Sequence, residues 1–567
     1  MPPKQPKTNQ PNSMKKITLF LFIIFSQTIF SAAKITEAEK LFATCKVWGF
    51  LKYYHPKIAG GEVNWDNQLL EKLPKIENAK TKEEFSLILE NWIDDLGPIK
   101  EIAPIAVPKD VDYFDKNFDL SWINSNKLLS KKLSKKLRFI EQNRFQGEQF
   151  YIYGVENAGN VGLRNENLKH PDFTYKNSKL RMVFMYWNLV EYFFPDKYLM
   201  DQKWDITLEK IIPIVIKADN QDDFYEVMRK LVSKINDSHT EFYAYLNAAT
   251  PKIRNYFPGN GKIIDDKLIV TEILADSLAQ ADDIKVGTVI TKINDKTIKE
   301  LIAENRDLIC ASNEPKYLDK LAEKILRSYT DEKIKIEFFK NDNYETKTMV
   351  WYNYHDSHRN EFKKGARKKK EKFKLLDHNI GYVDMGVIGV KNIPDMIEAL
   401  KNTKAIVFDM RNYPKGTFEA IGNFLNPQEK KFAIYTHPDL SYPGRYKWSE
   451  GTSIGFDNKD YYKGKVVLLL NEKAQSQAEW TAMCFQTAVN TTIVGSQTSG
   501  ADGNVSIFDF EGFNTQFSGI GVYYPDGRET QRIGIIPDIE VKPTIKGIQE
   551  GKDEVLDRAL LFIETGK

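Results

Sequence analysis

Residues 466–480 read VVLLLNEKAQSQAEW, a run of five apolar residues followed by a polar turn and then a helix-forming segment. The apolar run predicts a buried strand, and the pattern from Gln477 to Val489 predicts a helix that begins directly after Ser476. A serine at a helix start is most often an N-cap. The same position also offers free backbone N–H groups and the positive end of the helix dipole to an oxyanion, as acyl transfer requires. Ser476 is therefore a candidate nucleophile as well as a candidate cap.

Strands and helices alternate on both sides of this stretch. Apolar runs at 380–385 and 405–410 predict further buried strands, and the spacing at 393–401 predicts a helix between them. Such alternation is typical of an α/β domain built around one sheet. We expect this domain to occupy residues 375–567.

The first half of the chain contains an internal repeat with an offset of 139 residues. Eight residues of the first copy, Trp48, Tyr53, Pro56, Trp65, Asp66, Leu69, Pro74 and Phe85, recur without gaps as Trp187, Tyr192, Pro195, Trp204, Asp205, Leu208, Pro213 and Phe224. The apolar spacing within each copy is helical. We expect one helical unit over residues 34–130, a mixed connecting segment over 131–180, and a second unit over 181–250. The second copy alone runs into Asp237-Ser238-His239.

Short strands are predicted between the second repeat and the α/β domain. Residues 284–298, IKVGTVITKINDKTI, resemble the signature of PDZ domains in bacterial secreted proteases, with Thr288 in place of the usual Asp. The resemblance implies a PDZ-like domain at 258–352, and it leaves open whether the groove of this domain binds polypeptide C-termini. Residues 363–374 contain eight Lys or Arg in twelve. Because Phe373 is the only aromatic residue among them, we interpret 353–374 as a solvated linker rather than a nucleic-acid patch.

The N-terminus has the pattern of a secretory signal. Lys15 and Lys16 precede an apolar run at 17–25, and small residues follow at 31–33. We predict a signal peptide over residues 1–33, with export to the bacterial periplasm or cell exterior. An uncleaved anchor is the alternative, and Met14 leaves open an upstream extension of the natural start.

The composition gives little support for a cofactor or a nucleic-acid partner. Three widely spaced cysteines, Cys45, Cys310 and Cys484, suggest neither a disulfide framework nor a zinc site. His355 and His358 form an HxxH without a third ligand nearby, so we expect no metal. The net charge of +3 carries no argument for binding nucleic acid.

Four segments together resemble the tail-specific (carboxyl-terminal processing) serine peptidases of family S41. They are FDMRNYPKG at 408–416, NEKAQSQAE at 471–479, IVGSQTSG at 493–500 and GIIPDI at 534–539. The resemblance covers roughly residues 180–545. It implies a ClpP/crotonase-like α/β core, a polypeptide substrate, and hydrolysis through an acyl-enzyme on Ser476.

One departure from that family affects the general base. Many members place a lysine where this chain has Ala501. His239 instead resembles the histidine of the tricorn-like branch, which serves the nucleophile from far upstream. By the same resemblance, Ser238 orients the imidazole and relays it to a carboxylate near the C-terminal end. The matching position is Gln531, and Glu529 is the nearby carboxylate candidate.

The resemblance also indicates an oxyanion hole formed by the backbone N–H groups of Gly416 and Gln477. Loss of the lysine leaves open a second class of function, a catalytically inactive binding protein that keeps the S41 fold. Retention of Ser476, Ser238 and His239 opposes that alternative. Hydrolysis or transfer of a non-peptide acyl group is a third reading.

Overall fold

The computed structural model describes residues 1–4, 35–103, 105–106, 108–166, 172–244, 255–328, 331–340, 343–353, 371–510 and 513–567. Most of the predicted signal peptide lies outside these residues, as do most of the basic linker and the HxxH pair. No described helix is both long and apolar enough to cross a membrane.

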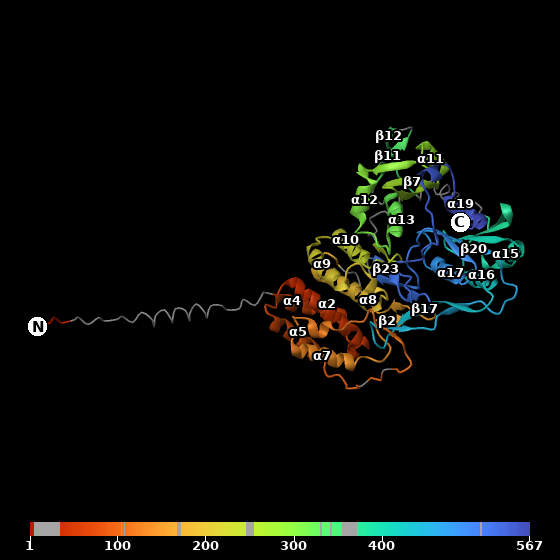
Figure 1. Ribbon diagram of the computed structural model, residues 1–567. Helices are drawn as coiled ribbons and strands as arrows, with labels where there is room; N and C mark the ends of the chain where they lie inside the picture. Colours follow the sequence, from red (N-terminus) through yellow and green to blue (C-terminus); the bar gives the residue numbers. More distant parts are fainter. Residues whose placement is uncertain are drawn as a thin grey trace.

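The internal repeat is visible as two sets of three helices (Figure 1). The first set is α2 (Glu37–Tyr54), α4 (Trp65–Asn78) and α5 (Lys82–Asp95), and the second is α8 (Lys176–Phe193), α9 (Trp204–Lys217) and α10 (Gln221–Ser233). Each helix of the second set begins 139 residues after its counterpart. In both sets the indole N–H groups of two tryptophans donate to each other's backbone carbonyls.

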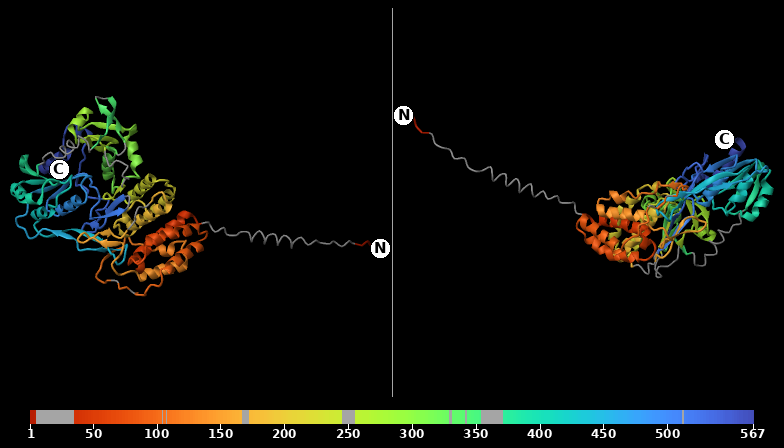
Figure 2. Two further views of the ribbon diagram at one scale, coloured as in Figure 1. Left: turned by 180° about the vertical axis from the view of Figure 1, so that it is seen from behind. Right: turned by 90° about the horizontal axis from the view of Figure 1, so that it is seen from below.

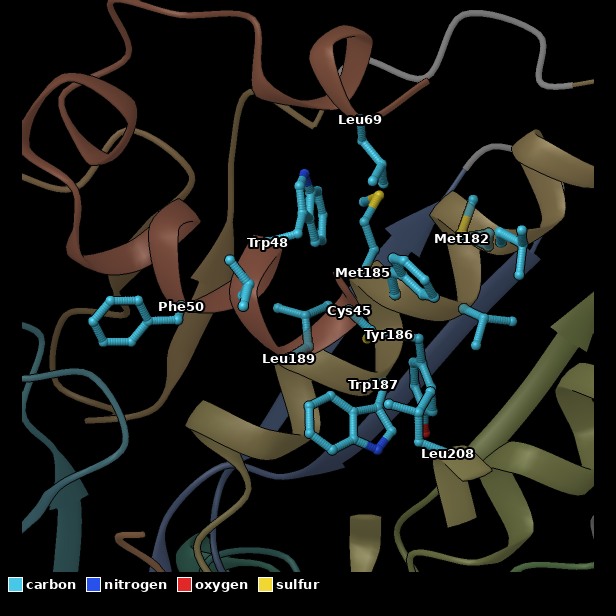
Figure 3. Close-up of a cluster of buried hydrophobic side chains, with 14 of the residues drawn as sticks. Cys45, Trp48, Phe50, Leu69, Met182, Met185, Tyr186, Trp187, Leu189 and Leu208 are labelled. Atoms are coloured by element: carbon cyan, nitrogen blue, oxygen red, sulfur yellow. The ribbon is translucent and has the colours of Figure 1, made fainter. Parts of the chain in front are cut away.

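The two copies pack directly against each other through α2 and α8. Gly49 of α2 faces Asn188 of α8, its counterpart in the repeat; a Cβ at Gly49 would lie 1.8 Å from Asn188 Oδ1. The Asn188 side-chain amide donates to the carbonyls of Cys45 and Phe184, which are also repeat counterparts. The buried side chains from both copies therefore form one continuous core (Figure 3).

A connecting region follows the first repeat. Its elements are β1 (Tyr113–Phe114), α6 (Trp122–Ser125), α7 (Lys131–Gln142), β2 (Ile152–Gly154) and β3 (Val161–Leu163). The Lys-rich stretch forms α7, which buries Leu133, Leu137 and Ile140 and exposes most of its lysines.

A β-rich unit occupies the middle of the chain. Its main sheet has the order β12-β11-β8-β7-β6 within the described residues, with β9 paired to β8. The strands are β6 (Gly259–Ile264), β7 (Lys267–Ile273), β8 (Val289–Ile293), β9 (Lys296–Thr297), β11 (Lys333–Lys340) and β12 (Asn343–Val350). Three helices accompany the sheet: α11 (Asp276–Ala281), α12 (Ile298–Asn305) and α13 (Glu314–Ile325). Of these, α13 packs beside β6 at the sheet edge.

The C-terminal part has a six-stranded sheet among the described residues, in the order β14-β15-β16-β20-β21-β25. The strands are β14 (Phe373–Leu376), β15 (Ile380–Asp384), β16 (Ala405–Asp409), β20 (Lys465–Leu470), β21 (Thr491–Gly495) and β25 (Ile539–Glu540). All adjacent pairs from β15 onward are parallel, and β14 is antiparallel.

Helices cover both faces of this sheet. One face packs against α15 (Ile393–Leu400), α16 (Phe418–Leu425) and α17 (Gln477–Phe485), and the other packs against α19 (Glu554–Thr565). The short helix α18 (Ile545–Gln549) precedes α19. The predicted strands and helices around residues 380–489 are thus present, although α17 ends four residues before Val489.

Smaller sheets join the N-terminal half to this domain. The strand β17 (Lys430–Pro438) pairs with β18 (Tyr446–Trp448), β19 (Thr452–Ile454) and β24 (Gly521–Tyr523), and β18 also pairs with β1. The strands β22 (Val505–Phe510) and β23 (Phe513–Ser518) pair with each other, and β23 pairs with β4 (Glu241–Ala244). The remaining short elements are α3 (Pro56–Ala59), β5 (Asn255–Tyr256), β10 (Arg327–Ser328) and β13 (Tyr352–Asn353). The second repeat thus lies directly against the C-terminal domain in both further views (Figure 2).

Candidate active site

Ser476 lies in the tight turn between β20 and α17. Its backbone has φ 56° and ψ −122°, a conformation that residues with a side chain rarely adopt. Two hydrogen bonds hold the turn: the Ser476 N–H donates to the carbonyl of Ala501 at 2.9 Å and to Glu479 Oε2 at 3.2 Å. The side chain is only partly buried. Strained backbone of this kind is concentrated at functional sites, where the surrounding structure fixes it.

Glu479 braces this turn from the first turn of α17. Its side chain is buried and accepts hydrogen bonds from the N–H groups of Ser476, Gly500 and Ala501 and from the hydroxyl of Thr498. Burial raises the pKa of Glu479 to about 7, although these donors favour the ionised form. Ala501, the position where the family often has lysine, therefore serves the turn through its backbone.

Gly416, one of the two residues predicted to supply the oxyanion hole, lies beside the side chain of the other, Gln477. Gly416 follows β16 in a loop with φ +65°, and a Cβ at this position would be 3.9 Å from Gln477 Nε2. A positive φ of this size is adopted readily by glycine. Neither backbone N–H donates a hydrogen bond within the described part of the chain. Among the described residues, both N–H groups therefore have no protein acceptor, and Gln477 directly follows Ser476.

His239 belongs to the loop between α10 and β4, and this loop is docked on the turn of the nucleophile. The Ser238 hydroxyl donates to the carbonyl of Ser499 at 2.8 Å and accepts the N–H of Ser312 at 2.9 Å. The Ser499 N–H in turn donates to the carbonyl of Ala474, two residues before Ser476. The structure thus brings the predicted base and the predicted nucleophile into one region, although the imidazole and the Ser476 hydroxyl are not hydrogen-bonded.

The imidazole of His239 is almost completely buried, with 7% of the residue exposed. Its Nδ1 lies 2.9 Å from the Ser518 hydroxyl oxygen, and that hydroxyl lies 3.1 Å from Asp237 Oδ1. Burial lowers the pKa of His239, the Asp237 carboxylate opposes that shift, and the ammonium groups of Lys320 and Lys316 reinforce it. A neutral imidazole at physiological pH is the form that a general base requires.

Three predicted positions have contacts other than those expected. Ser238 does not contact the imidazole, because its hydroxyl links Ser499 to Ser312; Ser518 makes the expected contact instead. Glu529 is paired with Lys116 at 2.9 Å and accepts the Tyr198 hydroxyl, so it does not reach His239.

Gln531 does lie at this site, but its side-chain amide donates to Asp237 Oδ1 at 3.1 Å rather than to the histidine. Sequence reasoning missed Asp237 and Ser518. Asp237 stands directly before the predicted pair, so its position was the available signal. Ser518 lies at the end of β23 in a segment without a motif.

Among the described residues, no group of three or more His, Cys, Asp or Glu side chains could hold a metal ion. The site therefore consists of a serine at a helix start, a buried histidine and unsatisfied backbone N–H groups. These are the groups that acyl transfer through a serine nucleophile requires.

The C-terminal part of the chain was compared with known protein families. Residues 379–541 match the sequence model of peptidase family S41. No curated protein matches the chain significantly. The C-terminal part of the chain is therefore similar to peptidase family S41 over these residues.

Solved structures of two CPAF forms are similar to this chain in fold. Mature CPAF complexed with lactacystin matches with a TM-score of 0.55 and 11% identity, covering 69% of this chain and 99% of that one. A mutant of CPAF gives a TM-score of 0.55 and 12% identity, covering 68% and 98%. The photosystem II D1 C-terminal processing protease matches at 14% identity over 67% and 98%, with a TM-score of 0.38 that is too low to support a comparison.

Proposed function

We propose that this chain is an endopeptidase that cleaves polypeptides through an acyl-enzyme on Ser476, with His239 as its general base. The observation that carries the proposal is the docking of the His239 loop on the nucleophile turn, through Ser238 and Ser499. The docked loop brings a candidate base to Ser476. Many S41 peptidases use a lysine for this purpose, and this chain has Ala501 at the position of that lysine.

In the proposed reaction, the Ser476 oxygen attacks the carbonyl carbon of the scissile bond while its proton moves to His239 Nε2. The N–H groups of Gly416 and Gln477 stabilise the oxyanion of the tetrahedral intermediate. The imidazolium then returns the proton to the leaving amine, so that an acyl-enzyme and a free N-terminus result. A water molecule, deprotonated by the same imidazole, hydrolyses the ester.

We further propose a ClpP/crotonase-like core around the six-stranded sheet and a PDZ-like role for the β-rich unit. The support for the second proposal is that β6 ends its sheet among the described strands and that α13 packs beside it. A peptide could add to such an edge as a further strand. Peptides with a free C-terminal carboxylate should then compete with substrate better than their amidated forms. Equal competition would contradict this role.

Export remains a proposal that rests on the sequence pattern at 1–33. Fractionation of cells expressing the full chain, with N-terminal sequencing of the recovered protein, would test it. A start before residue 34 in the mature protein would contradict cleavage at the predicted site.

The central experiment is labelling with a fluorophosphonate, combined with turnover of an unfolded polypeptide. The wild type should be labelled at Ser476, and Ser476→Ala and His239→Ala should each abolish both labelling and turnover. Ser506→Ala is the matched control, because Ser506 is a buried serine on the neighbouring strand β22 that bonds Asn160. Labelling that persists in Ser476→Ala would overturn the proposal. A folded wild type without turnover of polypeptides would favour the inactive binding protein.

A further inference from the structure

We propose that Asp237 and Ser518 form a relay that fixes the protonation of His239, and that Gln531 holds the relay in place. The proposal rests on the proposed function, because it concerns how His239 is prepared to act on Ser476. It assigns positioning roles to two residues outside the expected set and gives a reason for the glutamine at position 531.

The single hydroxyl hydrogen of Ser518 determines which group donates in each hydrogen bond of the relay. The Ser518 hydroxyl has one hydrogen, and its oxygen lies within hydrogen-bond distance of both Asp237 Oδ1 and His239 Nδ1. An ionised carboxylate only accepts, so the hydroxyl hydrogen must point to Asp237. His239 Nδ1 must then donate its N–H to the Ser518 oxygen. This tautomer leaves Nε2 without a proton and makes it the nitrogen that can accept one from Ser476.

The hydrogen bonds between the Asp237 carboxylate and its surroundings are all accepted by the carboxylate. The residue is fully buried, and its two oxygens accept five hydrogen bonds. The donors are the N–H groups of His239 and Ser518, the hydroxyls of Thr240 and Ser518, and the side-chain amide of Gln531.

Gln531 fits this arrangement because it adds a donor and no charge. A glutamate at position 531 would set a second carboxylate against Asp237 Oδ1, where the amide nitrogen now lies at 3.1 Å. Like charges at that separation disfavour each other's ionisation. The relay therefore has its carboxylate at Asp237, and the residue at 531 is complementary to it.

Charged groups on neighbouring elements oppose protonation of the His239 imidazole, and the Asp237 carboxylate counteracts them. Lys316 and Lys320 of α13 both disfavour the imidazolium, as does burial, whereas Asp237 favours it. Cys310 also borders the relay, since its sulfur accepts the N–H of Asp237. Without the Asp237 charge, the proton taken from Ser476 would reach a buried imidazole opposed by two ammonium groups.

The first test measures the tautomer in the intact wild type. Nitrogen chemical shifts of the enzyme with ¹⁵N-labelled histidine should show a proton on Nδ1 of His239 at neutral pH, with the signal identified by its loss in His239→Ala. A proton on Nε2 instead would overturn the relay. This measurement does not depend on whether any relay variant folds.

The second test uses Ser518→Ala and Asp237→Asn, with Ser518→Thr as the conservative rescue. Each of the first two should lower kcat by roughly 10²- to 10⁴-fold, the range of general-base and orienting effects, with little change in KM. Asp237→Asn should also move the acidic limb of the kcat/KM profile to lower pH, because the imidazolium loses its stabilising charge. Ser518→Thr keeps the hydroxyl and should retain most of the activity.

The matched controls are Ser506→Ala and Asp439→Asn. Asp439 is a buried aspartate that bonds Tyr113, Ser441 and Lys447 away from this site. Relay variants that behave like these controls would overturn the relay while leaving Ser476 and His239 in place. Loss of function in His239→Ala together with normal labelling in both relay variants would overturn the relay in the same way. Labelling that is independent of His239 would instead contradict the proposed function itself.

Discussion

Replacing Glu479 by glutamine should change how the stability of the C-terminal domain depends on pH. Burial raises the pKa of Glu479 from 4.5 to about 7 in the folded protein. Between these two values, the folded state keeps a proton that the unfolded chain has lost. The contribution of Glu479 to the free energy of unfolding therefore decreases as the pH rises through this window.

The size of this effect follows from the two pKa values and the burial of the side chain. Glu479 is 1% exposed, so solvent does not screen the effect. At about 1.4 kcal/mol per pH unit, the separation corresponds to roughly 3 kcal/mol. Glutamine does not titrate, but its amide nitrogen replaces an oxygen that accepts backbone N–H groups, which costs stability at every pH. The variant should accordingly be less stable than the wild type at pH 5, and this deficit should shrink by roughly 2–3 kcal/mol as the pH rises to 8.

Urea unfolding at several pH values between 5 and 8, followed by hydrogen exchange of residues 477–485, would measure this difference. Glu472→Gln is the control, since Glu472 lies in the same turn and pairs with Lys262. Parallel stability curves for wild type and Glu479→Gln would refute the reasoning. So would a variant that loses stability relative to the wild type as pH rises.

Three further predictions concern other parts of the chain. Gly49→Ala should destabilise the paired repeats by about 1–3 kcal/mol, the usual cost of overpacking, since its Cβ would meet the Asn188 side chain; thermal unfolding measures this, and an unchanged Tm would contradict the close packing. Lys316→Gln should raise the pKa of His239 and move the acidic limb of the kcat/KM profile to higher pH; an unmoved or lowered limb would count against it. Burial raises the pKa of Asp502 well above its usual value, and its Oδ2 has no hydrogen-bond partner among the described residues. Asp502→Asn should therefore stabilise the protein more at pH 8 than at pH 5, and a larger gain at pH 5 would refute this.

The repeat shows what sequence comparison within one chain can predict. Side chains such as Trp48 and Trp187 recur because each must fill the same space between equivalent helices. The helices accordingly begin at the predicted offset. Their mutual packing could not be predicted, because the pairing of Gly49 with Asn188 depends on how two copies face each other.

Site residues that lie in a sequence motif could be predicted. Site residues that reach the site only through the pairing of distant strands could not. Ser476 and His239 lie in such motifs, and the structure brings their loops together. Ser518 reaches the imidazole because β23 pairs with β4, directly after His239. That pairing brings Ser518 to a residue 279 positions earlier in the chain, and neither strand has a distinctive sequence. Ser238 was misjudged because its neighbour Ser312 belongs to another unit.

The hydrogen bonds of the Ser238 hydroxyl have a consequence for chains that are not yet fully synthesised or folded. One oxygen joins the second helical repeat to the β-rich unit, through Ser312, and to the C-terminal domain, through Ser499. A nascent or truncated chain that lacks any of these three parts has Ser476 without a seated histidine. If His239 is the general base as proposed, peptidase activity would require all three parts to be folded and assembled.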